Sequence, residues 1–247
     1  MSIQILPNQG RYGNQLFLYF LSRILSKYLN YKIYAPPSHD LDYSFNQSDK
    51  VSYDEPVIEL TDENFNSFDD FEKIINDQTP KKILLNGYFQ VKDFYIKHKN
   101  LIKEWFNLEK IQIPKDHVAI HIRLGDLLAT YHNHHLLPVS YYENALNMLN
   151  FSQLNICTDT PNHELIYYLI EKYNAKIFLS DEKNTISFLS SHNNLILSQG
   201  TFSFWAGFFC EGENIINAIP KTGWNSDLNS KFNLLIFNDE RYKNIAL

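Results

Sequence analysis

Residues 117–126 read HVAIHIRLGD, an apolar strand that ends in a histidine, an arginine and an aspartate. From this strand onward, short β-forming segments alternate with amphipathic segments of helical period. Such an alternation favours a parallel sheet with helices on both faces, so the expected fold class is α/β. The expected strands are 117–123, 154–158, 176–179, 194–197 and 215–219, and the expected helices are 141–149, 164–173, 185–191 and 202–209.

A second, less regular half precedes these elements. It opens with a strand at 3–6, a glycine turn and a helix at 14–29 whose apolar residues recur at three- and four-residue steps. Residues 38–70 are polar and show little period, which indicates loops and short elements. The remaining expected elements are strands at 31–35 and 82–85 and a helix at 94–106.

The turn Ile113-Pro114-Lys115-Asp116 is the best candidate for a domain boundary. Two Rossmann-like domains are therefore expected, residues 1–115 and 116–247, that face each other across a cleft. Ligands would bind in that cleft, at the carboxyl ends of the strands. One option is that a last helix of the second domain packs back on the first.

Composition argues against several classes of protein. The chain has 247 residues with 28 acidic and 22 basic side chains, and its net charge of −6 argues against nucleic acid as a partner. Its two cysteines, Cys157 and Cys210, lack a metal-type spacing, which favours a reducing compartment. The start MSIQILPNQG lacks the pattern of a secretion signal, and no apolar run approaches about 18 residues. We expect a cytoplasmic protein without a transmembrane segment, with a peripheral position at a membrane left open.

The first motif that could carry chemistry is GRYGNQ, residues 10–15, between the first strand and its helix. Gly10 and Gly13 permit a tight turn, and the free amides at the start of the helix favour an anion or an acceptor oxygen. Asn14 and Gln15 add neutral donors. The spacing is neither GxGxxG nor a phosphate loop. The alternative is that the glycines only shape the turn and that Asn14 caps the helix.

The second motif is the end of the strand at 117–123. Strand alternation places His121 and Arg123 on one face, which at a carboxyl end can border a cleft. The donor fork of an arginine fits a diphosphate bidentately. The alternative is an ion pair between Arg123 and Asp126 that closes the turn.

The third motif is SQGTFSFW, residues 198–205, a further turn from a strand to a helix. The hydroxyls of Thr201 and Ser203 stand where helix amides point outward, which suits a second phosphate contact. The alternative is that these two residues are N-caps and that Phe202 and Trp205 belong to the core.

Two sets of residues could imitate a metal site, and neither is favoured. Asp40 and Asp42 form an acidic pair, but a solvated loop is the better interpretation of that stretch. His132, His134 and His135 lie in a polar run without a clear carboxylate partner, so ordinary exposed histidines are favoured. We expect no metal site.

Six segments, taken together and in this order, resemble the GDP-fucose-dependent fucosyltransferases, most closely the α-1,2-fucosyltransferase family with its bacterial and viral relatives. The segments are GRYGNQLFLYF (10–20), LNGYFQ (85–90), HIRLGD (121–126), LPVSYY (137–142), ICTDTP (156–161) and TFSFW (201–205). The first part of the opening segment is also similar to the protein O-fucosyltransferases.

The resemblance implies a GT-B fold and an inverting transfer of L-fucose from GDP-β-L-fucose to a hydroxyl of an oligosaccharide or glycoconjugate acceptor, with no metal or other cofactor. It implies that Arg123 holds the β-phosphate and offsets charge on the departing GDP, and that Asn14 approaches the glycosidic oxygen. His121 would lie near the nucleoside and Asp159 near the base. The diphosphate would be bound at a helix start by Thr201, Phe202 and Ser203, with Gly10, Gly13 and Gln15 completing the donor site.

The chain departs from the family pattern at four positions. Leu124 stands where many members carry an arginine, Gly200 replaces a serine, Thr160 stands where an acidic residue is frequent, and Phe204 replaces a tryptophan. The donor therefore stays open to another nucleotide 6-deoxysugar, such as activated L-rhamnose. A non-catalytic glycan-binding relative is a further alternative. Candidates for a general base, by residue type only, are Asp126, His39, Asp40 and Asp42.

Overall fold

The computed structural model describes residues 1–6, 10–36, 41–43, 56–77, 79, 81–129, 135–219, 234 and 237–247. Its internal contacts divide the chain into two compact units, residues 1–104 and 105–247, and the division falls within helix α4 (Lys99–Phe106). The sequence places a domain boundary between residues 115 and 116, which stays a prediction. Each unit contains one parallel sheet.

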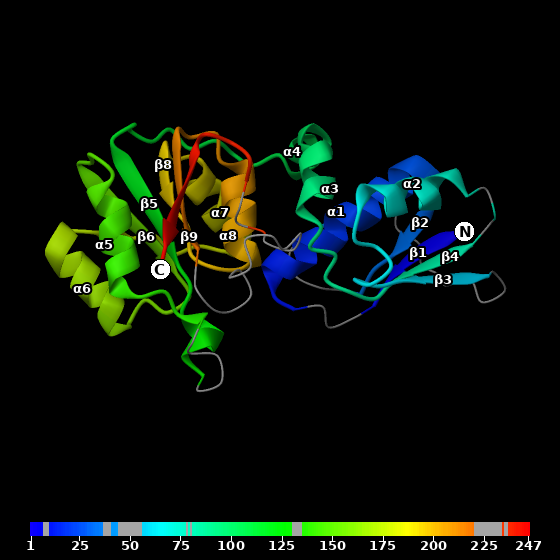
Figure 1. Ribbon diagram of the computed structural model, residues 1–247, viewed down its shortest axis with the longest axis horizontal. Coiled ribbons are helices and arrows are strands. Elements are labelled where there is room, and N and C mark those ends of the chain that lie inside the picture. The colour runs from blue at the N-terminus through cyan, green and yellow to red at the C-terminus, as the bar shows by residue number, and fades with distance from the viewer. Residues whose placement is uncertain are drawn as a thin grey trace. The chain divides into compact units, whose positions relative to one another are not determined.

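The sheet of the N-terminal unit has the strand order β2-β1-β4-β3. Its strands are β1 (Ser2–Ile5), β2 (Lys32–Tyr34), β3 (Val57–Leu60) and β4 (Lys82–Leu85), and its helices include α1 (Tyr12–Leu29), α2 (Phe68–Asn76) and α3 (Lys92–Lys97) (Figure 1). Helix α1 supplies much of the core, because Leu16, Phe17, Phe20 and Ile24 are fully buried. The two central strands are β1 and β4. The first motif, residues 10–15, follows β1, and Gln90 follows β4.

The structure corrects two expectations for this unit and gives bounds to a third. Helix α1 begins at Tyr12 with Arg11 as its N-cap, so Asn14 lies in the first turn and does not cap the helix. Strand β3 is one of the short elements expected in the region 38–70, and helix α2 begins at the end of that region and continues to Asn76. The helix expected at 94–106 is two helices, because the amide of His98 bonds to the carbonyl of Tyr95 three residues back and so ends α3.

The sheet of the C-terminal unit has six parallel strands in the order β10-β9-β8-β5-β6-β7 (Figure 1). The strands are β5 (His117–Ile122), β6 (Gln153–Thr158), β7 (Lys176–Ile177), β8 (Asn194–Ile196), β9 (Asn214–Ile219) and β10 (Tyr242–Ala246), and the helices are α5 (Val139–Asn147), α6 (Glu164–Tyr173), α7 (Glu182–Ser190) and α8 (Thr201–Phe209). Strand β10 occupies the described C-terminal stretch, where a last helix is one option from the sequence. Fold class α/β with Rossmann-like parallel sheets is confirmed, while the GT-B arrangement stays a prediction.

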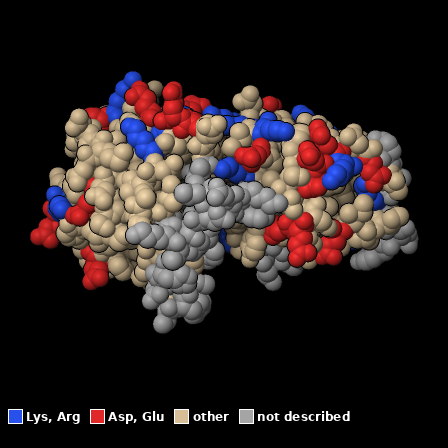
Figure 2. All heavy atoms as spheres, in the orientation of Figure 1, with Lys and Arg blue, Asp and Glu red and all other residues tan. Residues whose placement is uncertain are grey.

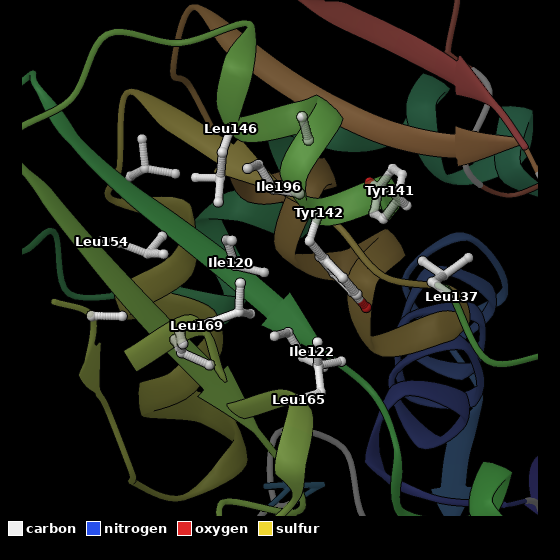
Figure 3. Close-up of a cluster of buried hydrophobic side chains, with 14 of the residues drawn as sticks. Ile120, Ile122, Leu137, Tyr141, Tyr142, Leu146, Leu154, Leu165, Leu169 and Ile196 are labelled. Carbon is white, nitrogen blue, oxygen red and sulfur yellow. The ribbon is translucent and has the colours of Figure 1, made fainter. Parts of the chain in front are cut away.

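Both faces of this sheet are covered, and strand β5 shows how. Val118, Ile120 and Ile122 pack into a cluster with α5 and α6 (Figure 3). Ala119, on the opposite face, packs into a second cluster with residues of α7 and α8. At the outer surface, lysines and carboxylates lie side by side, as in the pairs of Lys110 with Glu211 and Lys115 with Glu213. Figure 2 shows charges of both signs on the described surface. Exposed pairs contribute little to stability, so the buried clusters hold the unit together.

The strand order reverses between β5 and β8. From β5 the chain proceeds through β6 and β7 to one edge, and from β8 it proceeds through β9 and β10 to the other. In open parallel sheets, ligands bind outside the carboxyl ends of the strands at such a reversal. The segments that leave β5 and β8 are the second and third motifs of the sequence.

At the other end of the strands, His192 is almost fully buried. Its Nδ1–H donates to the carbonyl of Phe188 (2.9 Å), and its Nε2 accepts from the amide of Asn155 (3.2 Å). Burial lowers the pKa of His192 to about 4. The neutral ring is therefore built into the fold.

We expect the unfolding free energy to fall by a few kcal/mol as the pH drops from about 6.5 to about 4. In this window a histidine of the unfolded chain is protonated and native His192 is not, so the unfolded state binds more protons. Urea denaturation at pH 7 and pH 5 measures the effect, with His192→Gln as the control. If His192→Gln loses as much unfolding free energy between pH 7 and pH 5 as the wild type does, the prediction is wrong.

Candidate active site

Arg123 follows β5 at the reversal point, and its side chain is only 14% exposed. Its Nη2 lies 2.9 Å from Oδ2 of Asp126, and its Nε lies 3.4 Å from Oδ1. Its backbone amide donates to the hydroxyl of Ser198, which follows β8. The ion pair foreseen as an alternative is thus present, and it fixes the guanidinium at the carboxyl end of β5.

Gly200 gives the guanidinium its place. This residue has φ +96° and is the N-cap of α8. A Cβ atom built on Gly200 would lie 2.2 Å from Nη1 of Arg123, which no real contact allows. The guanidinium therefore lies against the bare Cα at the start of the helix. The departure from the family pattern at Gly200 has a structural reason here.

His121, which lies on the same face of the strand as Arg123, contacts the first turn of α8. His121 is buried, its Nδ1 lies 2.6 Å from the hydroxyl of Ser203, and its ring lies 5.0 Å from that of Phe202. The N-cap is Gly200, so the proposal that Thr201 or Ser203 caps the helix is wrong. Gly200 has no side chain that could cap α8. The first amides of a helix have no partner within it and point outward, toward an anion where one is bound.

Asp159 and Thr160, at the end of β6, hold the turn between Arg123 and Asp126. Oδ1 of Asp159 accepts from the amides of Leu124 (2.9 Å) and Gly125 (3.0 Å), and the hydroxyl of Thr160 also accepts from Gly125 (3.1 Å). The place of Asp159 near a base stays a prediction. The Leu124 side chain is buried in the cluster with α5 and α6, where an unpaired charge would be costly.

Ser198 and Gln199 are polar residues of this region to which sequence reasoning gave no role. Both are buried, and Gln199 donates through Nε2 to the carbonyl of His135. Oε1 of Gln199 is buried without a hydrogen-bond partner among the described residues. The sequence marks Ser198 and Gln199 only by their position between a strand and Gly200 of the third motif.

The residues considered as alternative metal ligands, Asp40, Asp42 and the histidines at 132, 134 and 135, do not form a metal cluster among the described residues. His135 is buried, so its interpretation as an exposed histidine is wrong, and Asp42 is exposed. The remaining metal candidates, Asp40, His132 and His134, lie outside the described residues, as does His39, a candidate general base. Within the described ranges, no group of three or more histidine, cysteine or acidic side chains could hold a metal ion.

The first motif lies in the N-terminal unit, and there too a side-chain nitrogen lies against a glycine with positive φ. Gly10 has φ +82°, and a Cβ built on it would lie 2.2 Å from Nδ2 of Asn14. Gln15 donates through Nε2 to the carbonyl of Gly10 (3.1 Å), and Oδ1 of Asn14 accepts from Nε2 of Gln90 (3.2 Å). Gly13 is a buried residue of α1. The turn therefore holds the side-chain carboxamide of Asn14 in a fixed position.

The expected site residues thus form two groups, one in each unit. That both groups face one cleft stays a prediction. The N-terminal group is Gly10, Gly13, Asn14 and Gln15, and the C-terminal group is His121, Arg123, Asp126, Asp159, Thr201, Phe202 and Ser203.

A comparison with protein families decides what kind of protein carries these groups. The model described as glycosyl transferase family 11 matches residues 85–239, more than half of the chain. The chain belongs to glycosyl transferase family 11. It is therefore a glycosyltransferase, and its family supports an activity of the fucosyltransferase type. No curated protein matches it.

The part matched by glycosyl transferase family 11 contains the whole C-terminal group and Gln90, whereas Asn14 lies before it. None of the described helices is long and apolar enough to cross a membrane.

We expect Gly200→Ala to weaken the binding of a nucleoside diphosphate at least tenfold, because the methyl group takes the place of Nη1 of Arg123. Isothermal titration with GDP measures the effect. The substitution is also strained at φ +96°, so a thermal melt should show a loss of stability and a folded protein at the titration temperature.

The control is the pair of variants Arg123→Ala and Arg123→Ala/Gly200→Ala. If Gly200 acts through Arg123, the alanine at position 200 changes GDP affinity little once the guanidinium is gone. Equal losses in both backgrounds would show that Gly200 acts independently.

Proposed function

We propose that this enzyme transfers L-fucose from GDP-β-L-fucose to a hydroxyl of a glycan acceptor, with inversion and without a metal ion. The observation that carries the proposal is the position of the Arg123 guanidinium against Gly200, at the amino end of α8. A full positive charge stands there beside helix amides that point outward. That combination suits a diphosphate.

The chemistry of the transfer explains why a diphosphate site formed by Arg123 and the amides of α8 would serve catalysis. Breaking the bond between the sugar and the phosphate leaves an oxocarbenium-like centre on the sugar and new negative charge on GDP. Donors that are already in place around the leaving group stabilise that charge without reorganising. In this proposal Arg123 does what a divalent cation does in metal-dependent transferases, and Thr201, Phe202 and Ser203 add their amides.

The remaining residues have supporting places in the proposal. Asn14 donates to the glycosidic oxygen, and His121, fixed by the hydroxyl of Ser203, lies near the nucleoside. Asp159 holds the turn after Arg123 and lies near the base. Asp126 holds the guanidinium in the resting protein through both carboxylate oxygens. It can act as a general base only when that pair opens.

The test is thermal stabilisation of the wild type and of Arg123→Ala by GDP, UDP, dTDP and ADP, each with and without a chelator. A ligand at about 100 times its Kd stabilises the native state by about 2.7 kcal/mol, which raises the Tm measurably. We expect GDP alone to stabilise the wild type, the chelator to change nothing, and Arg123→Ala to lose the shift.

The other outcomes separate the alternatives. Stabilisation by UDP or dTDP instead of GDP would assign a different nucleotide sugar to the same site. A shift that the chelator abolishes would contradict metal independence. If no nucleotide stabilises either protein while a glycan does, the chain is a glycan-binding relative without catalysis. Release of GDP from GDP-L-fucose then tests the reaction itself, and Arg123→Ala should abolish it.

A further inference from the structure

The segment LNGYFQ, residues 85–90, resembles a family segment and has no role in the proposed function. It follows β4 and contains Phe89, whose φ of +51° is rare for a bulky residue. Phe89 is fully buried. A residue stays in such a conformation only where the surrounding structure over-determines it, and such residues cluster at functional sites.

Two side chains hold this strained turn. The carboxylate of Asp62 accepts from the amide of Tyr88 (2.9 Å to Oδ2) and from that of Phe89 (2.6 Å to Oδ1). The hydroxyl of Tyr95 lies 2.9 Å from the carbonyl of Phe89 and 3.1 Å from that of Phe17 in α1, so its single proton serves both acceptors. Burial raises the pKa of Tyr95 well above its usual value, which keeps that proton in place.

Gly87 completes the arrangement. A Cβ built on Gly87 would lie 3.1 Å from Cγ of Asp62, closer than most real contacts. The glycine therefore lets the segment approach the carboxylate. Each residue from 87 to 89 has a structural reason in the turn, and the residue that the turn then aims is Gln90.

Gln90 reaches the first motif of the chain. Its Nε2 lies 3.2 Å from Oδ1 of Asn14, a contact across 76 positions of sequence. A carboxamide can present its oxygen or its nitrogen to either side after a rotation of about 180°. In the structure, Oδ1 of Asn14 faces Nε2 of Gln90, and Nδ2 of Asn14 lies against the Cα of Gly10.

We propose that Gln90 is a positioning residue that sets the amide of Asn14 with Nδ2 as a donor toward the substrate. The inference rests on the proposed function, in which Asn14 donates to the glycosidic oxygen. Asp62, Phe89 and Tyr95 act one step further back, because they aim Gln90. The sequence motif is thereby explained as a device for orienting one carboxamide.

The test compares Gln90→Met, which keeps the length of the side chain but cannot donate, with Gln90→Glu. The readout is kcat and KM for GDP release from GDP-L-fucose with water as acceptor, from pH 5 to pH 8. We expect Gln90→Met to lower kcat about tenfold at every pH with KM nearly unchanged. Gln90→Glu should lose as much at pH 8, where its carboxylate cannot donate, and recover part of the rate toward pH 5, where a protonated carboxyl can.

Controls separate this role from a general effect on the fold. Asn86→Ala removes an exposed carboxamide of the same segment that bonds to Glu59, and it should leave the rate unchanged. In an Asn14→Ala background, Gln90→Met should cause no more than about a twofold further loss. Thermal melts of all variants establish that the proteins are folded.

Several results would overturn the inference. If Gln90→Glu is as active as the wild type at pH 8, Asn14 presents the opposite edge of its amide. A full additional loss from Gln90→Met in the Asn14→Ala background would show that the two residues act independently. If the wild type releases no GDP, or Asn14→Ala keeps the full rate, the proposed function is at fault. Loss in Asn14→Ala with none in Gln90→Met refutes the positioning role alone.

Discussion

The pairing of β5 with β6 on one side and with β8 on the other is the constraint on which the C-terminal unit depends. It fixes which residues of β5 face which helices, because side chains of a strand alternate between faces. Ile120 and Ile122 enter the cluster with α5 and α6, and His121 turns to the first turn of α8. A slip of one residue would exchange the two faces and bury the imidazole among leucines and isoleucines. The register of a core strand thus decides where the polar groups emerge.

The two units share a solution to one problem, which is how to place a side-chain nitrogen against the main chain. In each unit a glycine with positive φ stands before a helix, and its missing Cβ leaves the space that Asn14 or Arg123 fills. The nitrogen comes from the same turn in the N-terminal unit and from a neighbouring strand in the C-terminal unit. In both cases the nitrogen lies against rigid main chain, and one further side chain, Gln90 for Asn14 and Asp126 for Arg123, holds the group in place.

Strand 82–85 and helix 164–173 could be predicted with the bounds that the structure shows, because their apolar residues are buried with a clear period. Strand β3 and helix α2 could not, since each buries one residue, Leu60 and Phe71. Sequence also indicated which motifs carry polar groups at the carboxyl ends of strands. It could not foresee that Asp62 bonds to the turn at Tyr88 or that Gln90 contacts Asn14, because those contacts join residues 26 and 76 positions apart through the tertiary fold.

Asp126 gives the resting protein a counter-ion of its own. The Arg123 guanidinium has already left bulk water during folding and is neutralised by a carboxylate that belongs to the chain. In the proposed function, an incoming diphosphate would exchange one anion for another at this arginine, and hydration of the cation would change little. Small monovalent anions such as chloride compete poorly with a bidentate carboxylate, whereas a multiply charged ligand that also reaches the helix amides gains contacts that Asp126 lacks. In the proposed function, the internal ion pair would therefore favour a diphosphate over small monovalent anions such as chloride.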